Sequence, residues 1–502
     1  MKNLIKPLLV IRYVSSSLIF LCLGLTFYAC NCGSSGGGGD LLPGQIAITV
    51  TNPAKTLSPV EKSVTFQVSV RGLSGSDTID VVDIDSADKT TYGLSLSDNT
   101  DIVAGENIIT IQYNGTMAVT DINPITLDLI ITDGESELAG DPKVVVKIAD
   151  GQVIGRPIPV TQDNIKGFNT YANITGASGG LNKHYKLTED VDWSLSGAAW
   201  TPIGRNGSTG SPNNFTGSFD GNGKKISKIT INNTDYYIGM FAGIGASGEV
   251  KNLGLESVNI SGGNNVGGVA GRSSGNIQNC YVIGTINGSS VVGGVVAEIS
   301  NSGLVEKCYV RVDIGGNGSS VGGIVGQANL SAVVVRNCYA AGNVTGIGNN
   351  YGGIEGYNYG GSVEKCYSIN NVKNSNGSGG YQYIGGVVGE HINSGTASNC
   401  VALNKTIQSD TGRTINIGRV SGTDSSNSTL INNYARLDMT INGYTPDAGA
   451  DKKDGETITP TEYFDRTWWI NTAKFDESVW NIENGKLPTL KGVGGAQNPV
   501  LP

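Results

Sequence analysis

Cysteine is the most reactive residue type that recurs in this sequence. Five of its eight cysteines lie at nearly constant distances from one another. The five are Cys280, Cys308, Cys338, Cys366 and Cys400. A thiolate can act as a nucleophile or ligate zinc. The spacing gives no C-x-x-C pair, however, and Leu253 stands one repeat earlier. We therefore expect these thiols to fill a core as small hydrophobes, with disulfides between adjacent repeats as the alternative.

Groups for acid–base catalysis are sparse. The two histidines, His184 and His391, are too far apart for an HExxH zinc motif and offer little for a Ser/His relay. Glycoside hydrolysis needs two carboxylates about 5 to 10 Å apart. Asp313 is the single aspartate between Tyr236 and Ile407, and the glutamates there show no convergent pair. We expect no catalytic residue, metal or cofactor; a polysaccharide lyase or glycoside hydrolase is the alternative.

One cluster of acidic residues could bind a hard cation. It consists of Asp80, Asp83, Asp85 and Asp88. Calcium takes several carboxylate oxygens, but this spacing is not that of an EF-hand loop. We interpret the cluster as a solvated acidic face, with a calcium site as the alternative.

Tyrosine follows cysteine in four consecutive repeats. These candidate binding residues are Tyr281, Tyr309, Tyr339 and Tyr367. Tyrosine combines a large, rigid contact area with a polar tip, which suits recognition surfaces. If the rings face outward, they would bind a host matrix protein or a glycan. The alternatives are an aromatic ladder that only stiffens the stack and one that faces inward.

Two ladders of residues place these side chains on a repeat protein. Glycines recur every 26 to 33 residues, at Gly239, Gly267, Gly293, Gly322, Gly352, Gly385 and Gly418. The cysteine ladder keeps step with them. Three positions before each of its rungs the residue is apolar, and the next residue is polar in every repeat but the last. This alternation is typical of half-buried strands, so we predict a parallel β-solenoid with glycines at its corners.

The polar residue of this pattern should form an outward row. Glu306, Arg336 and Glu364 would then be successive neighbours about 4.8 Å apart. Opposite charges at that distance favour the register, whereas like charges would oppose it.

Several segments resemble the bacterial GLUG-motif repeats. They are "NVGGVAG", "SVGGIVG" and "YIGGVVG", preceded by "FTGSFDGNGKKISKITINN" and followed by "SVWNIENGKLPTL", over about residues 165 to 492. The resemblance implies a right-handed β-helix of a bacterial surface protein, adhesin-like in function. Other proteins with these repeats are zinc peptidases that cut immunoglobulin A, but their HExxH motif has no counterpart here.

The regions flanking the solenoid have their own patterns. Alternating strands split by turns over 43–153 predict an immunoglobulin-like sandwich, so the fold class is all-β. The solenoid should cover 154–445, and 446–502 should cap its open end. The aromatic and apolar residues of that cap are Trp468, Trp469, Phe475, Trp480, Leu487 and Leu490; a sugar-stacking site is the alternative for the tryptophans.

The N-terminus has the layout of an export signal. A basic head and a short apolar run over 1–29 end in "FYACNCGSSGGGGD", which resembles a lipobox. Cys30 would carry the lipid and 30–42 would form a flexible tether; an ordinary secreted protein or an uncleaved anchor is the alternative. We expect a cell-envelope protein held at a membrane by this lipid, at the outer membrane or cell surface. With a net charge of -9 and no basic cluster, nucleic acid is not an expected partner.

Overall fold

The computed structural model describes residues 45–502 with internal gaps. The gaps are 72–81, 85–93, 98–104, 114–124, 132–136, 139–141, 177–178, 331, 376–381, 410–415, 424–426 and 442–443. The predicted signal peptide, Cys30 and the tether lie outside the described residues, as do Asp80, Asp85, Asp88 and the side chain of Asp83.

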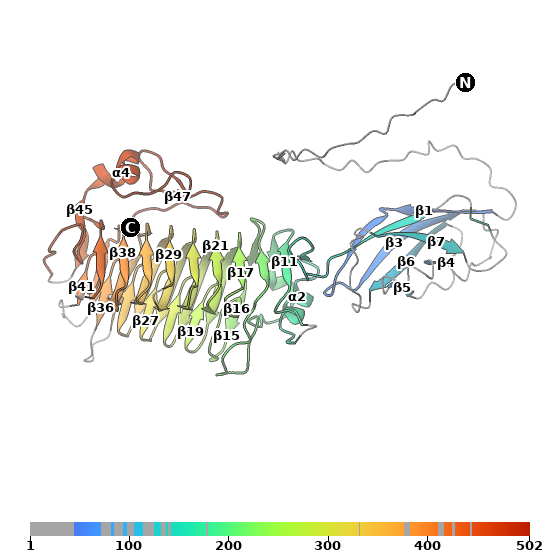
Figure 1. Cartoon of the computed structure of the whole chain (residues 1–502), viewed down its shortest axis with the longest axis horizontal. Coiled ribbons are helices and arrows are strands. Elements are labelled where there is room, and N and C mark those ends of the chain that lie inside the picture. The colour runs from blue at the N-terminus through green and yellow to red at the C-terminus, as the bar shows by residue number, and fades with distance from the viewer. Residues whose placement is uncertain are drawn as a thin grey trace, which may run out of the picture.

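Two sheets form the N-terminal sandwich (Figure 1). One contains β5 (Leu94–Ser97), β6 (Gly105–Tyr113), β3 (Ser63–Arg71), β1 (Gln45–Thr51) and β8 (Glu137–Leu138), in that order. The other contains β2 (Ala54–Leu57), β9 (Lys143–Ile148), β7 (Ile125–Ile131) and β4 (Val82–Ile84). Alternation in β3 buries Phe66 and Val68 between the sheets. The pairing is antiparallel except for β1–β8 and β2–β9. The chain passes from one sheet to the other between β1 and β2, at Asn52, with φ of 51°, and Pro53.

Each repeat of the solenoid visits four sheets, named S1 to S4 in chain order. S1 contains β10 (Ile158–Val160), β11 (His184–Leu187), β13 (Ser218–Asp220), β17 (Glu249–Lys251), β21 (Asn276–Gln278), β25 (Leu304–Glu306), β29 (Val334–Arg336), β33 (Ser362–Glu364), β38 (Thr396–Ser398) and β42 (Thr429–Ile431). S2 contains β12 (Val191–Asp192), β14 (Lys225–Ser227), β15 (Thr230–Asn232), β18 (Gly254–Ser261), β22 (Tyr281–Gly288), β26 (Tyr309–Gly316), β30 (Tyr339–Gly346), β34 (Tyr367–Ser368), β35 (Asn371–Asn374), β39 (Val401–Ala402), β40 (Thr406–Ser409), β43 (Tyr434–Arg436), β44 (Thr440–Ile441) and β45 (Glu456–Ile458).

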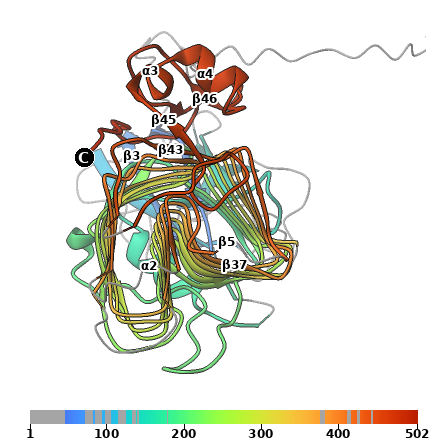
Figure 2. The same ribbon diagram turned by 90° about the vertical axis from the view of Figure 1, so that its left-hand side faces the viewer.

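The other two sheets are shorter. S3 contains β19 (Asn265–Gly267), β23 (Val291–Gly293), β27 (Ser320–Gly322), β31 (Asn350–Gly352), β36 (Tyr383–Gly385) and β41 (Ile417–Gly418). S4 contains β16 (Phe241–Ile244), β20 (Ala270–Ser273), β24 (Val296–Ser300), β28 (Val325–Asn329), β32 (Glu355–Tyr359) and β37 (Val388–Ile392). All their ladders are parallel, and Figure 2 shows the coils superimposed when viewed along the axis. The predicted parallel solenoid is confirmed.

Both predicted ladders are in register. Gly293, Gly322 and Gly352 are direct neighbours in S3. In S1, Val305 pairs with Val335 and faces the core, while Glu306 pairs with Arg336 on the outside.

The expected reason for the glycines is only partly right. A Cβ on Gly322 would lie 1.9 Å from the carbonyl oxygen of Val325, so the glycine is needed for close backbone approach between S3 and S4. Its φ is not positive. The left-handed corners lie before each cysteine instead, at residues such as Asn279, Lys307 and Asn337 with φ of 53°. Asparagine tolerates this conformation better than most residues.

Helices and a C-terminal segment close the solenoid. Its first coil is covered by α2 (Ile165–Ala172), which buries Ile165 and Phe168 in the core. A 3₁₀ helix, η1 (Trp193–Ser196), follows in the first coil. The ladder continues to Ile458, beyond the predicted boundary at 445, because β45 pairs with β43.

Residues 459–502, which we call the flap, do not cap the open end as expected. The flap contains α3 (Pro460–Tyr463), α4 (Arg466–Asn471) and the hairpin β46 (Trp480–Asn481) with β47 (Thr489–Leu490). It lies outside the outline of the coils (Figure 2) and runs back along S2 (Figure 1). The tyrosine column of S2 is apolar enough to draw the aromatic residues of this segment onto the side of the stack.

Candidate functional site

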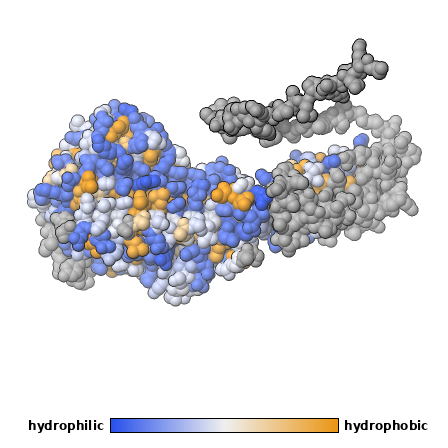
Figure 3. All heavy atoms as spheres, viewed as in Figure 1, coloured by the Kyte–Doolittle hydropathy of each residue, from blue (hydrophilic) through white to orange (hydrophobic). Residues whose placement is uncertain are grey.

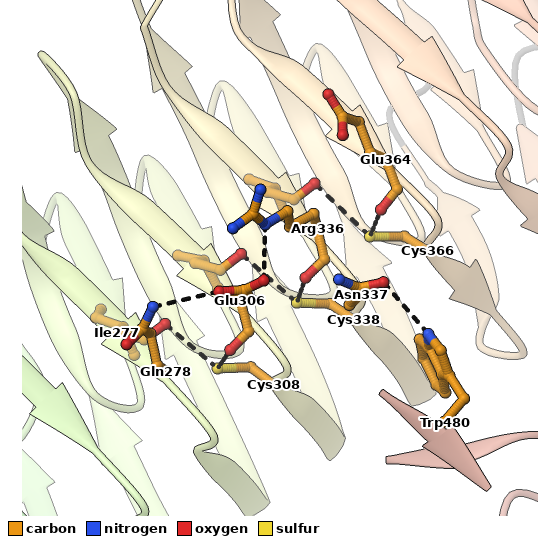
Figure 4. Close-up of polar contacts among 12 residues, drawn as sticks. Ile277, Gln278, Glu306, Cys308, Arg336, Asn337, Cys338, Glu364, Cys366 and Trp480 are labelled. Carbon is orange, nitrogen blue, oxygen red and sulfur yellow. Dashed lines mark hydrogen bonds and ion pairs between the residues drawn. The ribbon is translucent and has the colours of Figure 1, made fainter. Parts of the chain in front are cut away.

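The five repeat cysteines form a closed column inside the corner between S1 and S2. All are buried and free. Each thiol donates to two backbone carbonyls; Cys308 Sγ lies 3.3 Å from the Glu306 oxygen and 3.7 Å from the Ile277 oxygen (Figure 4). Burial raises the pKa of the Cys280 and Cys338 thiols, which disfavours the thiolate. The prediction that these residues fill the core is confirmed.

The four candidate tyrosines stack on the outer face of S2. Neighbouring rings in the series Tyr281, Tyr309, Tyr339 and Tyr367 lie 5.0 to 5.1 Å apart at angles of 4° to 6°. The flap covers them, however, and between 0% and 4% of each residue is exposed. The Tyr309 hydroxyl donates to Gly494 O at 3.1 Å and that of Tyr367 to Pro488 O at 2.6 Å. The prediction of an accessible binding surface on these rings is therefore wrong.

The flap tryptophans contact the same column. Trp469 and Trp480 are fully buried, with ring centroids 5.7 Å from that of Tyr367. The indole nitrogen of Trp480 donates to Asn337 Oδ1 at 3.3 Å (Figure 4). These two rings pack against protein and offer no face for a sugar, so their role is in the core of the flap.

The outward side chains of β21, β25, β29, β33 and β38 form the surface that we call the outer wall. Its charged column is ordered: Gln278 Nε2 lies 3.2 Å from Glu306 Oε2, and Arg336 Nε lies 2.7 Å from Glu306 Oε1 (Figure 4). Beside this column Leu304 and Val334 are half-buried. Figure 3 shows patches of hydrophobic residues scattered among hydrophilic ones on the solenoid face turned to the viewer. The wall thus mixes charge with apolar area.

Polar groups interrupt the interior in S4. Glu355 stands in register between Val325 and Val388, and Asn358 stands beside His391. All three polar side chains are fully buried. Burial raises the pKa of Glu355 well above its usual range and lowers that of His391 to about 4. Both groups are therefore neutral at pH 7, and His391 lies in the core rather than at a site.

His184 and Ser218 form a serine–histidine contact that was not predicted from the sequence. His184, Ser218 and Glu249 are successive neighbours on the outer face of S1. Nδ1 of His184 lies 2.8 Å from Ser218 Oγ, and burial lowers the histidine pKa. A relay needs an acid on the second ring nitrogen to orient the histidine, but Glu249 stacks beyond the serine. Aligning "HYKL", "SFDG" and "EVKN" as equivalent strands would have revealed the contact.

The described segments offer no metal centre or membrane helix. Within them, His, Cys, Asp and Glu side chains nowhere gather in a group of three that could hold a metal ion. None of the helices that the structure describes combines the length and apolar character that a membrane span requires.

Relatives with known names match only part of the chain. No protein-family model matches. Halomucin of Haloquadratum walsbyi is 30% identical over 277 residues, which is 52% of this chain and 3% of halomucin. A candidate Gly-rich membrane protein of Evansella cellulosilytica is 34% identical over 132 residues, or 24% of this chain and 15% of that protein. This chain therefore spans a small fraction of either relative.

Two solved structures match parts of this chain. A candidate immunoglobulin A1 protease from Bacteroides ovatus has a TM-score of 0.48 at 18% identity, over 68% of this chain and 94% of that one. A solved IgA1 protease has a TM-score of 0.43 at 14% identity, over 87% of this chain and 31% of that one. Neither likeness bears on activity.

Proposed function

We propose that this chain is a non-catalytic, adhesin-like protein of the cell envelope that presents its outer wall to a protein partner, such as one of the host matrix. The proposal rests on the composition of this wall. Gln278, Glu306 and Arg336 form an ordered column that faces solvent. Beside it lie the half-buried side chains of Leu304 and Val334. Apolar area with a polar margin is the composition of a protein interface. The names halomucin and Gly-rich membrane protein agree with a location at the surface.

The size of the wall favours weak contacts made many times. Five strands at about 4.8 Å spacing and three residues each at about 3.3 Å give roughly 240 Å². A stable interface needs about 800 Å² per partner. One copy would therefore bind weakly, whereas many copies anchored side by side would gain avidity. A lipid at Cys30 would supply that anchoring, with the sandwich holding the solenoid away from the membrane.

The test compares one copy with many. Beads that carry the whole chain at high density should adhere to a panel of matrix proteins, and the free chain should compete only weakly. Exchanging the charges of the column, as Glu306→Arg, Arg336→Glu and Glu364→Arg together, keeps opposite charges adjacent but reverses the pattern and should abolish adhesion. The matched control is the exposed flap pair, exchanged as Arg466→Glu with Glu477→Arg.

Two results would count against the proposal. If the variant with the exchanged wall adhered as well as the variant with the exchanged flap pair, the outer wall would not be the surface that binds the partner. Turnover of a glycan or peptide that is lost on a substitution within the solenoid would show an enzyme instead.

A further inference from the structure

A cleft lies where the sandwich meets the first coils, on the outer face of S1 that continues from β17 into the outer wall. Its volume is about 420 Å³, within the range of small-ligand sites, and domain junctions commonly hold such sites. The floor is made by outward side chains of β11, β13 and β17, including Lys186, Ser218 and Lys251. One side is the loop with Ile154 and Gly155.

The loop over the cleft is fixed in place. The His184 backbone N–H donates to Gly151 O at 2.9 Å, and Gly151 N–H donates to Arg156 O at 3.0 Å. Gly151 has φ of 67°, and a Cβ there would lie 2.9 Å from the Ile158 side chain. Arg156 also lies 3.4 Å from Asp150. The cleft is thus preorganised, which reduces the entropy that a ligand must lose.

The lining carries positive charge in an acidic chain. Lys186, Asp220 and Lys251 form one column across three coils. Lys251 is paired with Glu249 at 2.7 Å, but Lys186 and Lys147 form no ion pair within the described residues. A second cleft of about 250 Å³ adjoins the first and shares Lys147 and Lys186. Two lysines therefore remain to bind an anionic group.

The other lining groups suit hydroxyls and a sugar face. Asp220 Oδ1 accepts the Asn222 N–H at 2.8 Å and Asn252 Nδ2 at 2.9 Å, and a carboxylate has further acceptor sites. Ser218 can donate to or accept from a hydroxyl. Ile154 and Pro157 supply the apolar wall that C–H groups need. A bare inorganic anion would gain nothing from Asp220, which repels it.

We propose that this junction cleft binds an acidic sugar, with its carboxylate between Lys147 and Lys186 and its hydroxyls toward Asp220 and Ser218. The site uses none of the side chains of the outer wall, although its Lys251 is the register neighbour of Gln278.

The test is calorimetric titration of the whole chain with a galacturonic acid trisaccharide, beside a neutral galactose trisaccharide and inorganic phosphate. The acidic sugar should bind at least tenfold more tightly than the neutral one, and added salt should weaken its binding. Lys186→Ala and Lys147→Ala should each lose about tenfold in affinity. Lys486→Ala, which removes an exposed flap lysine, should lose nothing.

Each contrary outcome identifies which part fails. Equal affinity for the acidic and neutral sugars, or equal behaviour of Lys186→Ala and Lys486→Ala, would overturn the site. Binding of phosphate as tight as that of the acidic sugar would overturn the assignment to a sugar. The charge-exchanged wall should bind the trisaccharide normally, so failure of the adhesion proposal would leave this result unaffected.

Discussion

The first and second halves of the solenoid share one outline but have different interiors. Near the start, aromatic rings fill the core; the Phe168 centroid lies 4.9 Å from that of Tyr185 and 5.5 Å from that of Phe219. Near the end, Asn404 Nδ2 lies 2.6 Å from both Ser368 Oγ and the Asn370 oxygen, all of them buried.

The coils therefore stack in the same register whether aromatic or polar side chains fill the interior. Non-directional apolar packing stabilises the first half. The second half keeps an apolar core but adds buried polar groups, some of them hydrogen-bonded, as in the buried contact of Arg419 Nε with Asp454 O at 2.9 Å. The halves should therefore respond differently to substitution and to pH.

The largest effect should come from opening the aromatic interior. Phe219→Ala removes a fully buried ring and leaves a cavity among Phe168 and Phe241, which should lower the free energy of unfolding by about 3–5 kcal/mol. Urea unfolding at pH 5 and pH 8 should give the same loss, because no titrating group is removed. A loss that depends on pH would contradict a purely apolar first half.

The polar half should weaken in acid through His391. Its folded-state pKa of about 4 lies below the ordinary value of 6.5, so the unfolded chain binds the proton first. The contribution of neutral His391 to stability is complete above pH 6.5 and falls by about 3 kcal/mol as the pH drops toward 4. His391→Leu should flatten this part of the urea-midpoint profile. If the urea midpoint of the variant depended on pH as that of the wild type does, a group other than His391 would cause the loss of stability in acid.

Glu355 should act in the opposite direction. Its pKa is raised in the folded state, so stability is lost as the pH rises above its unfolded value near 4.5. Glu355→Val completes the column of Val325 and Val388 and should stabilise the chain by about 1–3 kcal/mol at pH 7.5. The gain should shrink toward pH 4.5 in thermal melts. Destabilisation at pH 7.5 would show that the carboxyl has a partner.

The smallest effect should come from the outer wall. Arg336→Ala breaks the contact with Glu306, but the arginine side chain is 43% exposed, so the loss should be about 0.2–1 kcal/mol. The shift in urea midpoint should vanish in 1 M salt. A loss above 2 kcal/mol would mean that this pair, rather than the core, sets the register.

Prediction from sequence succeeded where each coil repeats the last. Val305, Glu306 and Cys308 have counterparts in neighbouring coils, so their inward or outward direction could be inferred from one pattern. Nothing repeats in the flap, and the aromatic group around Trp480 was equally compatible with an end cap. The pattern of the sequence did not assign a packing partner to these tryptophans or to the tyrosine column. That the two groups pack against each other is decided by the tertiary structure. The junction cleft depends likewise on where a non-repeating loop lies.

The return of the flap changes how this molecule can come apart. A linear array of coils frays from its ends, because each coil contacts only its neighbours. Here Gly494 O accepts the Tyr309 hydroxyl at 3.1 Å, and Tyr309 belongs to β26, several coils before the last one. The final coil cannot separate from the stack while the flap stays bound to the tyrosine column. Without the flap, the solenoid would unfold one coil at a time under tension. With the flap bound, the coils that it spans should resist unfolding together until the flap detaches.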